Sequence, residues 1–258
     1  MAIAARIDSF IAPTITQQSL YDGIKQAFTN AGYPAPTSEF LSGTDRVVVY
    51  AVILDNTRIY GTTFIRIRVT TGLVVAQQIF ATWNAGTNSG TGNSSELIYT
   101  AFASNVQINF VALNAASEFR LVMLFQGSIY FPLGFIAPQN RPAWWNLDAW
   151  NYCFLPVSST FALLRGTTIN PYSNTEHDTN LNIGRMGIAN TITNRRDILQ
   201  GIVTYTQVNQ GISGRSSDDL IMVAGSGTTR FDIVQVPGST NQYLILNPAS
   251  GGLAVRIA

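Results

Sequence analysis

Charged residues are scarce in this sequence, and the few that occur nearly balance. They make up 11% of the 258 residues and leave a formal net charge of +1, whereas soluble globular domains carry about 25% charged residues. An isolated domain relies on charge for solubility. A thin layer of charge on a chain that is 46% hydrophobic therefore predicts a protein covered by copies of itself or by partners.

Lysine is almost missing. It occurs once, as Lys25, and every other basic residue is an arginine. Arginine suits bidentate pairing at interfaces better than lysine does, so this bias points the same way, with codon or lineage bias as the alternative explanation. The one adjacent basic pair, Arg195-Arg196, is followed at once by Asp197. Because phosphate binding depends on clustered Lys and Arg, the sequence predicts no nucleic-acid partner.

Cysteine and histidine each occur once, as Cys153 and His177. Cys153 lies within an aromatic cluster, where we expect a small buried hydrophobe rather than a reactive thiol. A single cysteine forms no disulfide framework and leaves the redox compartment open. A zinc site takes three or four His and Cys ligands as a rule, so one of each is too few. We expect no metal site and no cofactor.

No segment reads as a membrane span or a secretory signal. Residues 121–140 carry no charge, but they hold two prolines, two glycines and several polar residues. A β-hairpin uses these residues and a lipid-facing helix mostly avoids them. Near the amino terminus, Arg6 and Asp8 interrupt the apolar core that a signal peptide needs. The sequence predicts no membrane span.

Residues 118–155 are the stretch around which we expect the chain to be organised. Two strand-like apolar runs meet there across a turn at Gly127-Ser128 and continue into an aromatic cluster. Large aromatic side chains bury the most apolar surface per residue, so this stretch predicts the core. The aromatic residues concerned are Phe125, Tyr130, Phe131, Phe135, Trp144, Trp145, Trp150, Tyr152 and Phe154. If exposed, the tryptophans would form a glycan-stacking platform, and burial is the favoured outcome.

One helix is predicted near the amino terminus, over residues 16–31. Thr16 is a suitable N-cap, and Gly32 followed by Pro34 marks the carboxyl end. Apolar residues at helical spacing share one face: Leu20, Ile24, Ala27 and Phe28. We expect this helix to cover one face of a sheet.

From Asp45 onward the pattern changes to β. Runs at 45–55, 58–70, 72–83, 96–115 and 118–126 are bounded by Asn, Gly, Ser or Thr, with turns expected at 55–57 and 70–72. Arg66 and Arg68 alternate with Ile65, Ile67 and Val69, which indicates a sheet with one wet and one packed face. Short β-like runs return after Leu199, as a small antiparallel unit that extends the first sheet or stands apart.

The predicted fold class is therefore mainly β, a β-rich α+β protein with antiparallel sheets or a sandwich and one N-terminal helix. Its expected divisions are a helix-plus-β core domain at 1–165, a long polar connection at 166–197 and a small C-terminal antiparallel β-unit at 198–258. Residues 84–95 read as a flexible loop. They lack the Gly-Lys-Ser/Thr ending of a phosphate-binding loop and the GxGxxG of a dinucleotide fold.

Candidate catalytic residues are few, and we assign none. His177 stands between Glu176 and Asp178 in polar sequence, without the GxSxG elbow of a serine hydrolase. A glycosidase needs only two acids a few ångströms apart, and the candidate pairs are Glu176 with Asp178 and Asp218 with Asp219. Both pairs lie in turn-like sequence, where solvated acids and turn formers are the expected roles.

Three stretches carry a family resemblance: SLYDGIKQAFTNAGY, RIRVTTGLVVAQQIFATWNAGTN and RPAWWNLDAWNYCFLP. With the low charge and the Asn/Thr/Gly-rich loops, they resemble structural proteins of tailed, cyanophage-like bacteriophages, from the tail, baseplate or fibre-attachment region. The resemblance implies a β-rich, homo-oligomeric, non-enzymatic virion subunit, assembled in the host cytoplasm, whose partners are its own copies and other virion proteins. It transfers no site residues.

Two alternatives stay open within that resemblance. One is a receptor-binding tail protein that contacts host surface glycan, and the other is a capsid decoration protein. The sequence shows neither heptads nor short repeats, so a globular adaptor, baseplate or decoration subunit is favoured over a fibre shaft.

Overall fold

The structure is a computed structural model. It describes residues 3–53, 62–93, 96–116, 118–137, 153–157, 160–164, 192–193, 196, 198–201, 203–205, 212–223, 227–236, 238–248 and 252–258. Within these ranges the protein is mainly β, with several antiparallel sheets and a single helix near the amino terminus. The predicted fold class is confirmed.

The helix α1 (Gln17–Asn30) begins and ends where its sequence predicts. The Thr16 hydroxyl accepts a hydrogen bond from the Ser19 N–H at 3.1 Å, and the Ser19 hydroxyl accepts one from the Thr16 N–H at 2.9 Å. These two bonds form a capping box and satisfy donors that the first turn leaves free. Gly32 follows the helix with a φ of +80°, which a side chain would strain. The predicted apolar stripe is buried.

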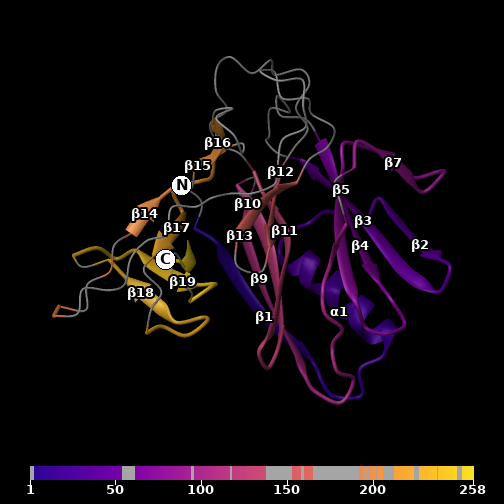
Figure 1. The fold of residues 1–258 in the computed structure, drawn as a ribbon, viewed down its shortest axis with the longest axis horizontal. Coiled ribbons are helices and arrows are strands. Elements are labelled where there is room, and N and C mark those ends of the chain that lie inside the picture. The colour runs from indigo at the N-terminus through magenta and orange to yellow at the C-terminus, as the bar shows by residue number, and fades with distance from the viewer. Residues whose placement is uncertain are drawn as a thin grey trace.

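A six-stranded antiparallel sheet forms the centre of the molecule, in the order β1-β9-β10-β11-β12-β13 (Figure 1). Its strands are β1 (Ala5–Ile11), β9 (Ile108–Ala115), β10 (Phe119–Gln126), β11 (Ile129–Ile136), β12 (Cys153–Val157) and β13 (Thr160–Leu164). The hairpin predicted across Gly127-Ser128 is confirmed, with Gln126 paired to Ile129 and Gly127 at a φ of +56°. Strand β1 was not predicted.

A second antiparallel sheet runs in the order β2-β3-β4-β5-β8. Its strands are β2 (Ser38–Ser42), β3 (Asp45–Ile53), β4 (Thr62–Val69), β5 (Val75–Phe80) and β8 (Leu97–Ile98). In β4, Ile65, Ile67 and Val69 are buried while Arg66 and Arg68 are half-buried on the other face, so the predicted alternation is confirmed. The turn at 70–72 is present, whereas the link at 55–57 lies outside the described residues.

Two local predictions are wrong. The run at 96–115 is only partly β, because residues 99–107 leave the sheet and place Tyr99 and Phe102 in the core. The segment 84–95 is not simply a loop, because β6 (Thr82–Asn84) and β7 (Ser89–Thr91) form a tight hairpin. Its turn is closed by the Asn84 side chain, whose Oδ1 accepts from the Gly86 N–H at 2.9 Å. The Asn- and Gly-rich residues that predicted a loop thus form the turn between β6 and β7.

The hairpin of β6 and β7 packs on the outer face of the second sheet. The Trp83 ring lies 5.1 Å from that of Phe80, and its Nε1–H donates to the Ser38 Oγ at 2.9 Å. A Cβ on Gly90 would lie 2.5 Å from the Phe80 ring and 2.6 Å from the Thr82 carbonyl oxygen. Glycine is needed there for close packing and not for binding phosphate.

The C-terminal part forms its own five-stranded antiparallel sheet in the order β14-β17-β20-β19-β18, beside a two-stranded pair of β15 and β16. The strands are β14 (Ile198–Gln200), β15 (Val203–Tyr205), β16 (Ile212–Arg215), β17 (Leu220–Val223), β18 (Ile233–Gln235), β19 (Gln242–Ile245) and β20 (Gly252–Arg256). The described strands from Ile198 onward thus form antiparallel sheets that are separate from the first two.

The strands β9, β10 and β11 are buried on both faces. Their first face packs with α1 and the second sheet; we define it by Phe110, Ala112, Val122, Leu124, Leu133 and Phe135. Their second face packs with the C-terminal sheet; we define it by Val111, Leu113, Leu121, Met123 and Ile136. The six-stranded sheet is therefore the middle layer, with α1 and the second sheet on one side and the C-terminal sheet on the other (Figure 1).

Candidate functional site

Several predicted candidates lie outside the described residues, namely Glu176, His177, Asp178, Trp144, Trp145 and Trp150. The catalytic and glycan-stacking readings of these residues stay predictions, and so does the burial of the aromatic cluster. The backbone of Cys153 lies in β12. Asp218 and Asp219 are described, in the turn that precedes β17.

Asp219 is a buried structural carboxylate, with 2% of the residue exposed. Its Oδ1 lies 3.5 Å from the Arg256 Nη1, and its backbone N–H donates to the Ser217 Oγ at 3.1 Å. The Ser217 hydroxyl in turn donates to the carboxylate of Glu118, the residue just before β10. Asp219 thus belongs to a chain of contacts that joins the C-terminal sheet to the six-stranded sheet.

Within the described ranges, no group of three or more His, Cys, Asp or Glu side chains is arranged to hold a metal ion. Within the same part of the chain, no helix has the length and apolar character needed to cross a membrane.

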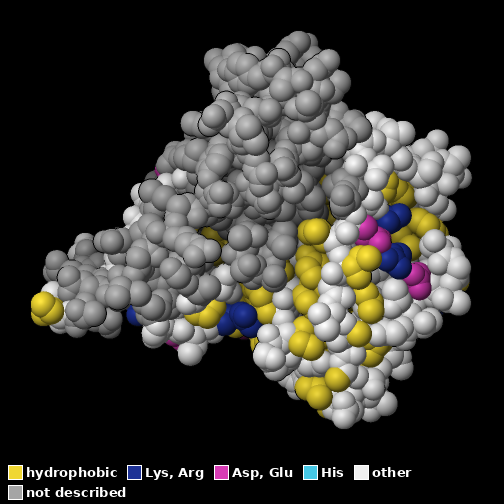
Figure 2. Space-filling view, in the orientation of Figure 1, with side chains coloured by type: hydrophobic (Ala, Val, Ile, Leu, Met, Phe, Trp, Pro, Cys, Tyr) yellow, Lys and Arg dark blue, Asp and Glu magenta, His cyan; other side chains and the backbone are white. Residues whose placement is uncertain are grey.

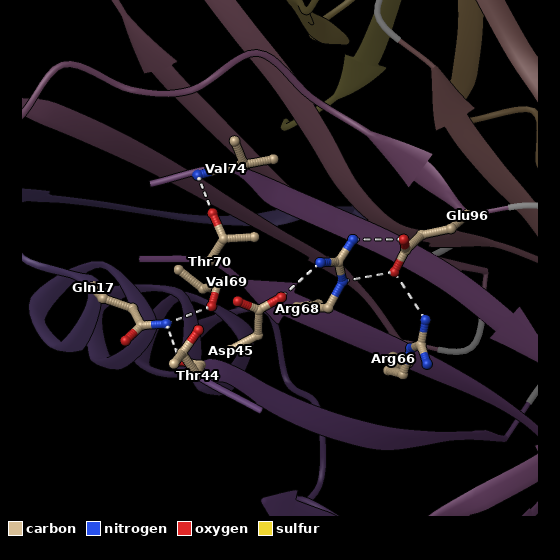
Figure 3. A network of polar contacts seen from close by, with 9 residues as sticks. All are labelled: Gln17, Thr44, Asp45, Arg66, Arg68, Val69, Thr70, Val74 and Glu96. Atoms are coloured by element: carbon tan, nitrogen blue, oxygen red, sulfur yellow. Dashed lines mark hydrogen bonds and ion pairs between the residues drawn. The ribbon is translucent and has the colours of Figure 1, made fainter. Parts of the chain in front are cut away.

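The half-buried arginines of β4 are held in an ion-pair network (Figure 3). The Arg68 guanidinium donates to both oxygens of Glu96, at 3.0 and 2.6 Å, and to the Asp45 Oδ2 at 2.7 Å. Arg66 donates to the Glu96 Oε1 at 2.8 Å. Burial opposes ionisation of Glu96, but the hydrogen bonds and charges of the two arginines outweigh it and lower the pKa of that carboxyl.

This network links three parts of the second sheet. Glu96 precedes the edge strand β8 and Asp45 begins β3, so the contacts tie β4 to its neighbour β3 and to the segment that leads into β8. Arg66 also stacks 5.4 Å above the Phe80 ring. Paired, half-buried arginines are poor ligands for an external anion, since a ligand would have to displace an internal carboxylate. The outer face of the second sheet is therefore not the favoured site.

More than half of the large exposed hydrophobic residues in the described ranges lie at the edges of the sheets. Edge strands carry five large exposed hydrophobic residues: Ile7 and Phe10 on β1, Leu41 on β2, Ile98 on β8 and Ile233 on β18. Figure 2 shows hydrophobic side chains mainly on the right-hand part of the visible face, with a small group of charged ones beside them. Soluble proteins usually protect such edges with lysine, proline, bulges or a covering element. The described edges are the candidate site, as surfaces for pairing with another chain.

Among the edge strands in the described part of the chain, β1 is the longest, at 7 residues. It pairs with β9 in continuous register, without a bulge, and it exposes 65% of Phe10 and 45% of Ile7. Arg6 and Asp8 face each other along the strand in a bidentate ion pair, with distances of 2.8 and 2.7 Å. The sequence signal was the alternation of residues 5–11, which is short and contains two charges, and we interpreted it only as excluding a signal peptide.

No family model matches the chain, and neither the curated proteins nor the solved structures contain a match.

Proposed function

We propose that this protein is a non-enzymatic structural subunit of a phage particle, in the tail, baseplate or fibre-attachment region. It assembles through homo-oligomeric contacts with its own copies and heteromeric contacts with other virion proteins. Its site of action is the virion, which is assembled in the host cytoplasm.

The observation that carries this proposal is the placement of five exposed apolar residues on edge strands, with Phe10 65% and Leu41 62% exposed. An unprotected edge offers unpaired backbone groups beside an apolar side chain, which is the surface that a strand from another chain covers. The low charge of the whole sequence agrees with a surface that becomes buried on assembly. The phage particle itself rests on the resemblance of the three sequence stretches.

Sedimentation of the purified full-length chain, combined with electron microscopy of the particle, tests the proposal. We expect sedimentation to show an oligomer whose size depends on concentration. We expect electron microscopy to place the protein in the tail, baseplate or fibre-attachment region. A stable monomer that binds host polysaccharide and is displaced by free sugar would overturn the proposal in favour of the glycan-binding tail protein. Density on the outer capsid surface would favour the decoration protein.

The rival enzymatic function has its own test. The full-length chain is incubated with host polysaccharide and with peptidoglycan, beside the variants Glu176→Gln and Asp218→Asn. We expect no hydrolysis by any of the three. Hydrolysis by the natural chain that either variant abolishes, with circular dichroism unchanged, contradicts the non-enzymatic proposal.

A further inference from the structure

We propose that β1 pairs antiparallel with β1 of a second copy, about a twofold axis at Ile7, so that two six-stranded sheets become one. This inference rests on the proposed function, because it names the partner and the register for one of the edges through which the subunit assembles. It follows from the free backbone of β1, from its charge pattern and from its length.

The outer side of β1 has open backbone groups from Arg6 onward. In an antiparallel strand, the N–H and C=O groups of successive residues point alternately to the two sides. Just before β1, the outward Ala4 N–H is already used, because it donates to the Arg256 carbonyl at 3.1 Å, so a partner strand pairs beyond that point. The same alternation directs the backbone groups of Arg6, Asp8 and Phe10 away from β9. Within the described residues, no backbone hydrogen bond reaches these three from outside the sheet.

The charges select one register. Directly opposite residues of an antiparallel pair must both point their backbone groups at the partner or both point them away, so the register shifts in steps of two. A twofold axis at Arg6 places Arg6 opposite the partner's Arg6, and an axis at Asp8 places two carboxylates opposite each other. An axis at Ile7 places Arg6 opposite the partner's Asp8, and Asp8 opposite the partner's Arg6. Like charges directly opposite are destabilising, and opposite charges are stabilising.

In this register the Arg6–Asp8 ion pairs of the two copies form one cluster of four alternating charges. Arg6 already holds Asp8 of its own strand at 2.7 Å, and each charge gains a second neighbour of opposite sign across the twofold axis. Both charges lie on the second face, since they pair with Leu113 and Val111 of β9. The sequence Arg-x-Asp is thus its own complement when it is read antiparallel, which favours a second copy over an unrelated strand.

The opposite face of the strand supplies the apolar contact. Ile7 meets the partner's Ile7 at the axis, in a pair without mutual backbone hydrogen bonds, where side chains approach most closely. Its side chain is 45% exposed in the single chain and becomes covered. The Arg6 and Asp8 pairs together add about four backbone hydrogen bonds, each of modest net value.

Other edges suit the role less well. Strand β8 has 2 residues and β18 has 3, which leaves few ladder bonds to form. Strand β2 has 5 residues, and its acidic residue Glu39 accepts from Lys25 of the helix rather than facing outward to a partner. Only β1 among these combines length, open backbone groups and a self-complementary charge pair.

Charge exchange in the full-length chain tests the register. The acidic variant Arg6→Asp and the basic variant Asp8→Arg each place like charges opposite each other, so we expect each to raise the dissociation constant of the dimer by about tenfold or more. The double variant Arg6→Asp/Asp8→Arg restores complementarity and should dimerise as the natural chain does. Mixing the acidic with the basic variant should form a heterodimer that neither forms alone.

Sedimentation equilibrium measures the dimer dissociation constant of the natural chain, the three variants and the mixture. Leu41→Asp on the β2 edge is the matched control, and it should leave the β1 dimer unchanged. Circular dichroism confirms that each variant is folded. If the Arg6→Asp variant oligomerises with the same affinity as the natural chain, the β1 register is overturned and the proposed assembly function stands. A natural chain that stays monomeric at all concentrations overturns both.

Discussion

The two faces of β9, β10 and β11 are both buried, but they are closed by different interactions. On the first face, the buried Gln77 side chain donates to the Pro132 carbonyl at 3.0 Å, and the Tyr99 hydroxyl donates to the same oxygen at 2.9 Å. On the second face, the Arg230 guanidinium lies 3.8 Å from the centre of the Tyr130 ring, and the Phe125 and Phe231 rings lie 5.0 Å apart.

One sheet thus holds its two neighbouring layers by different means. Polar groups inside the first face each have a specific partner on the other sheet, so they fix the position of the second sheet as well as its distance. Buried hydroxyl and amide groups tolerate little displacement, because an unpaired buried polar group costs about 1–3 kcal/mol. The second face relies more on aliphatic and aromatic packing, and the hydrogen bond from Ser217 to Glu118 joins the C-terminal sheet to it just before β10.

The largest expected effect comes from truncating one core side chain on each face. Phe110→Ala on the first face should cost about 3–5 kcal/mol of unfolding free energy, and Leu113→Ala on the second about 2–5 kcal/mol. Both residues lie in β9 and are fully buried. Denaturant unfolding measures the two losses. One transition that moves in both variants indicates a single cooperative unit, whereas a second transition that moves only in Leu113→Ala shows that the second face unfolds independently.

A glycine substitution tests how closely the backbone packs near the first face. Gly134 has a φ of +110°, and a Cβ there would lie 2.1 Å from the Arg120 carbonyl oxygen and 3.0 Å from the Tyr33 hydroxyl. Gly134→Ala should therefore cost about 2–4 kcal/mol, from backbone strain and the clash together. The control is Gly127→Ala, which also has a positive φ but meets nothing within 4 Å. Equal losses in thermal unfolding would show that the close contact with Arg120 contributes nothing.

The smallest change in unfolding free energy is expected in the second sheet, where Glu96 makes the stability depend on pH. Glu96 is stabilised as a carboxylate, so its folded-state pKa lies below its unfolded value of about 4.3. The stabilisation is present above that pH and is lost as the pH falls through the folded-state pKa. Glu96→Gln should cost about 1 kcal/mol at neutral pH and flatten the decline of stability in acid.

Stability measured at several pH values from neutral to strongly acidic checks this prediction. Arg68→Gln removes the main partner of Glu96 and should flatten the same part of the curve. An unchanged acid dependence in both variants would mean that the network of Figure 3 adds no net stability.

Local features of the fold could be predicted from the sequence because neighbouring residues decide them. Thr16 and Gly32 mark the ends of α1 through bonds and backbone angles within a few residues. Gly127-Ser128 turns the central hairpin, and the alternation of Arg66 and Arg68 with isoleucines gives β4 its two faces. Each of these signals lies within a single element and requires no distant partner.

The arrangement of the layers and the sheet edges could not be predicted from the sequence, because it depends on contacts between residues that are far apart in the chain. Trp83 holds its hairpin to Ser38, and Glu118 reaches Ser217. Strand β1 becomes a sheet edge only because β9 pairs with one of its sides and, in the described structure, no strand pairs with the other. Residues 5–11 specify a strand weakly by themselves. Their place at an open edge, and with it the candidate assembly surface, depends on long-range pairing that hydrophobic pattern alone does not encode.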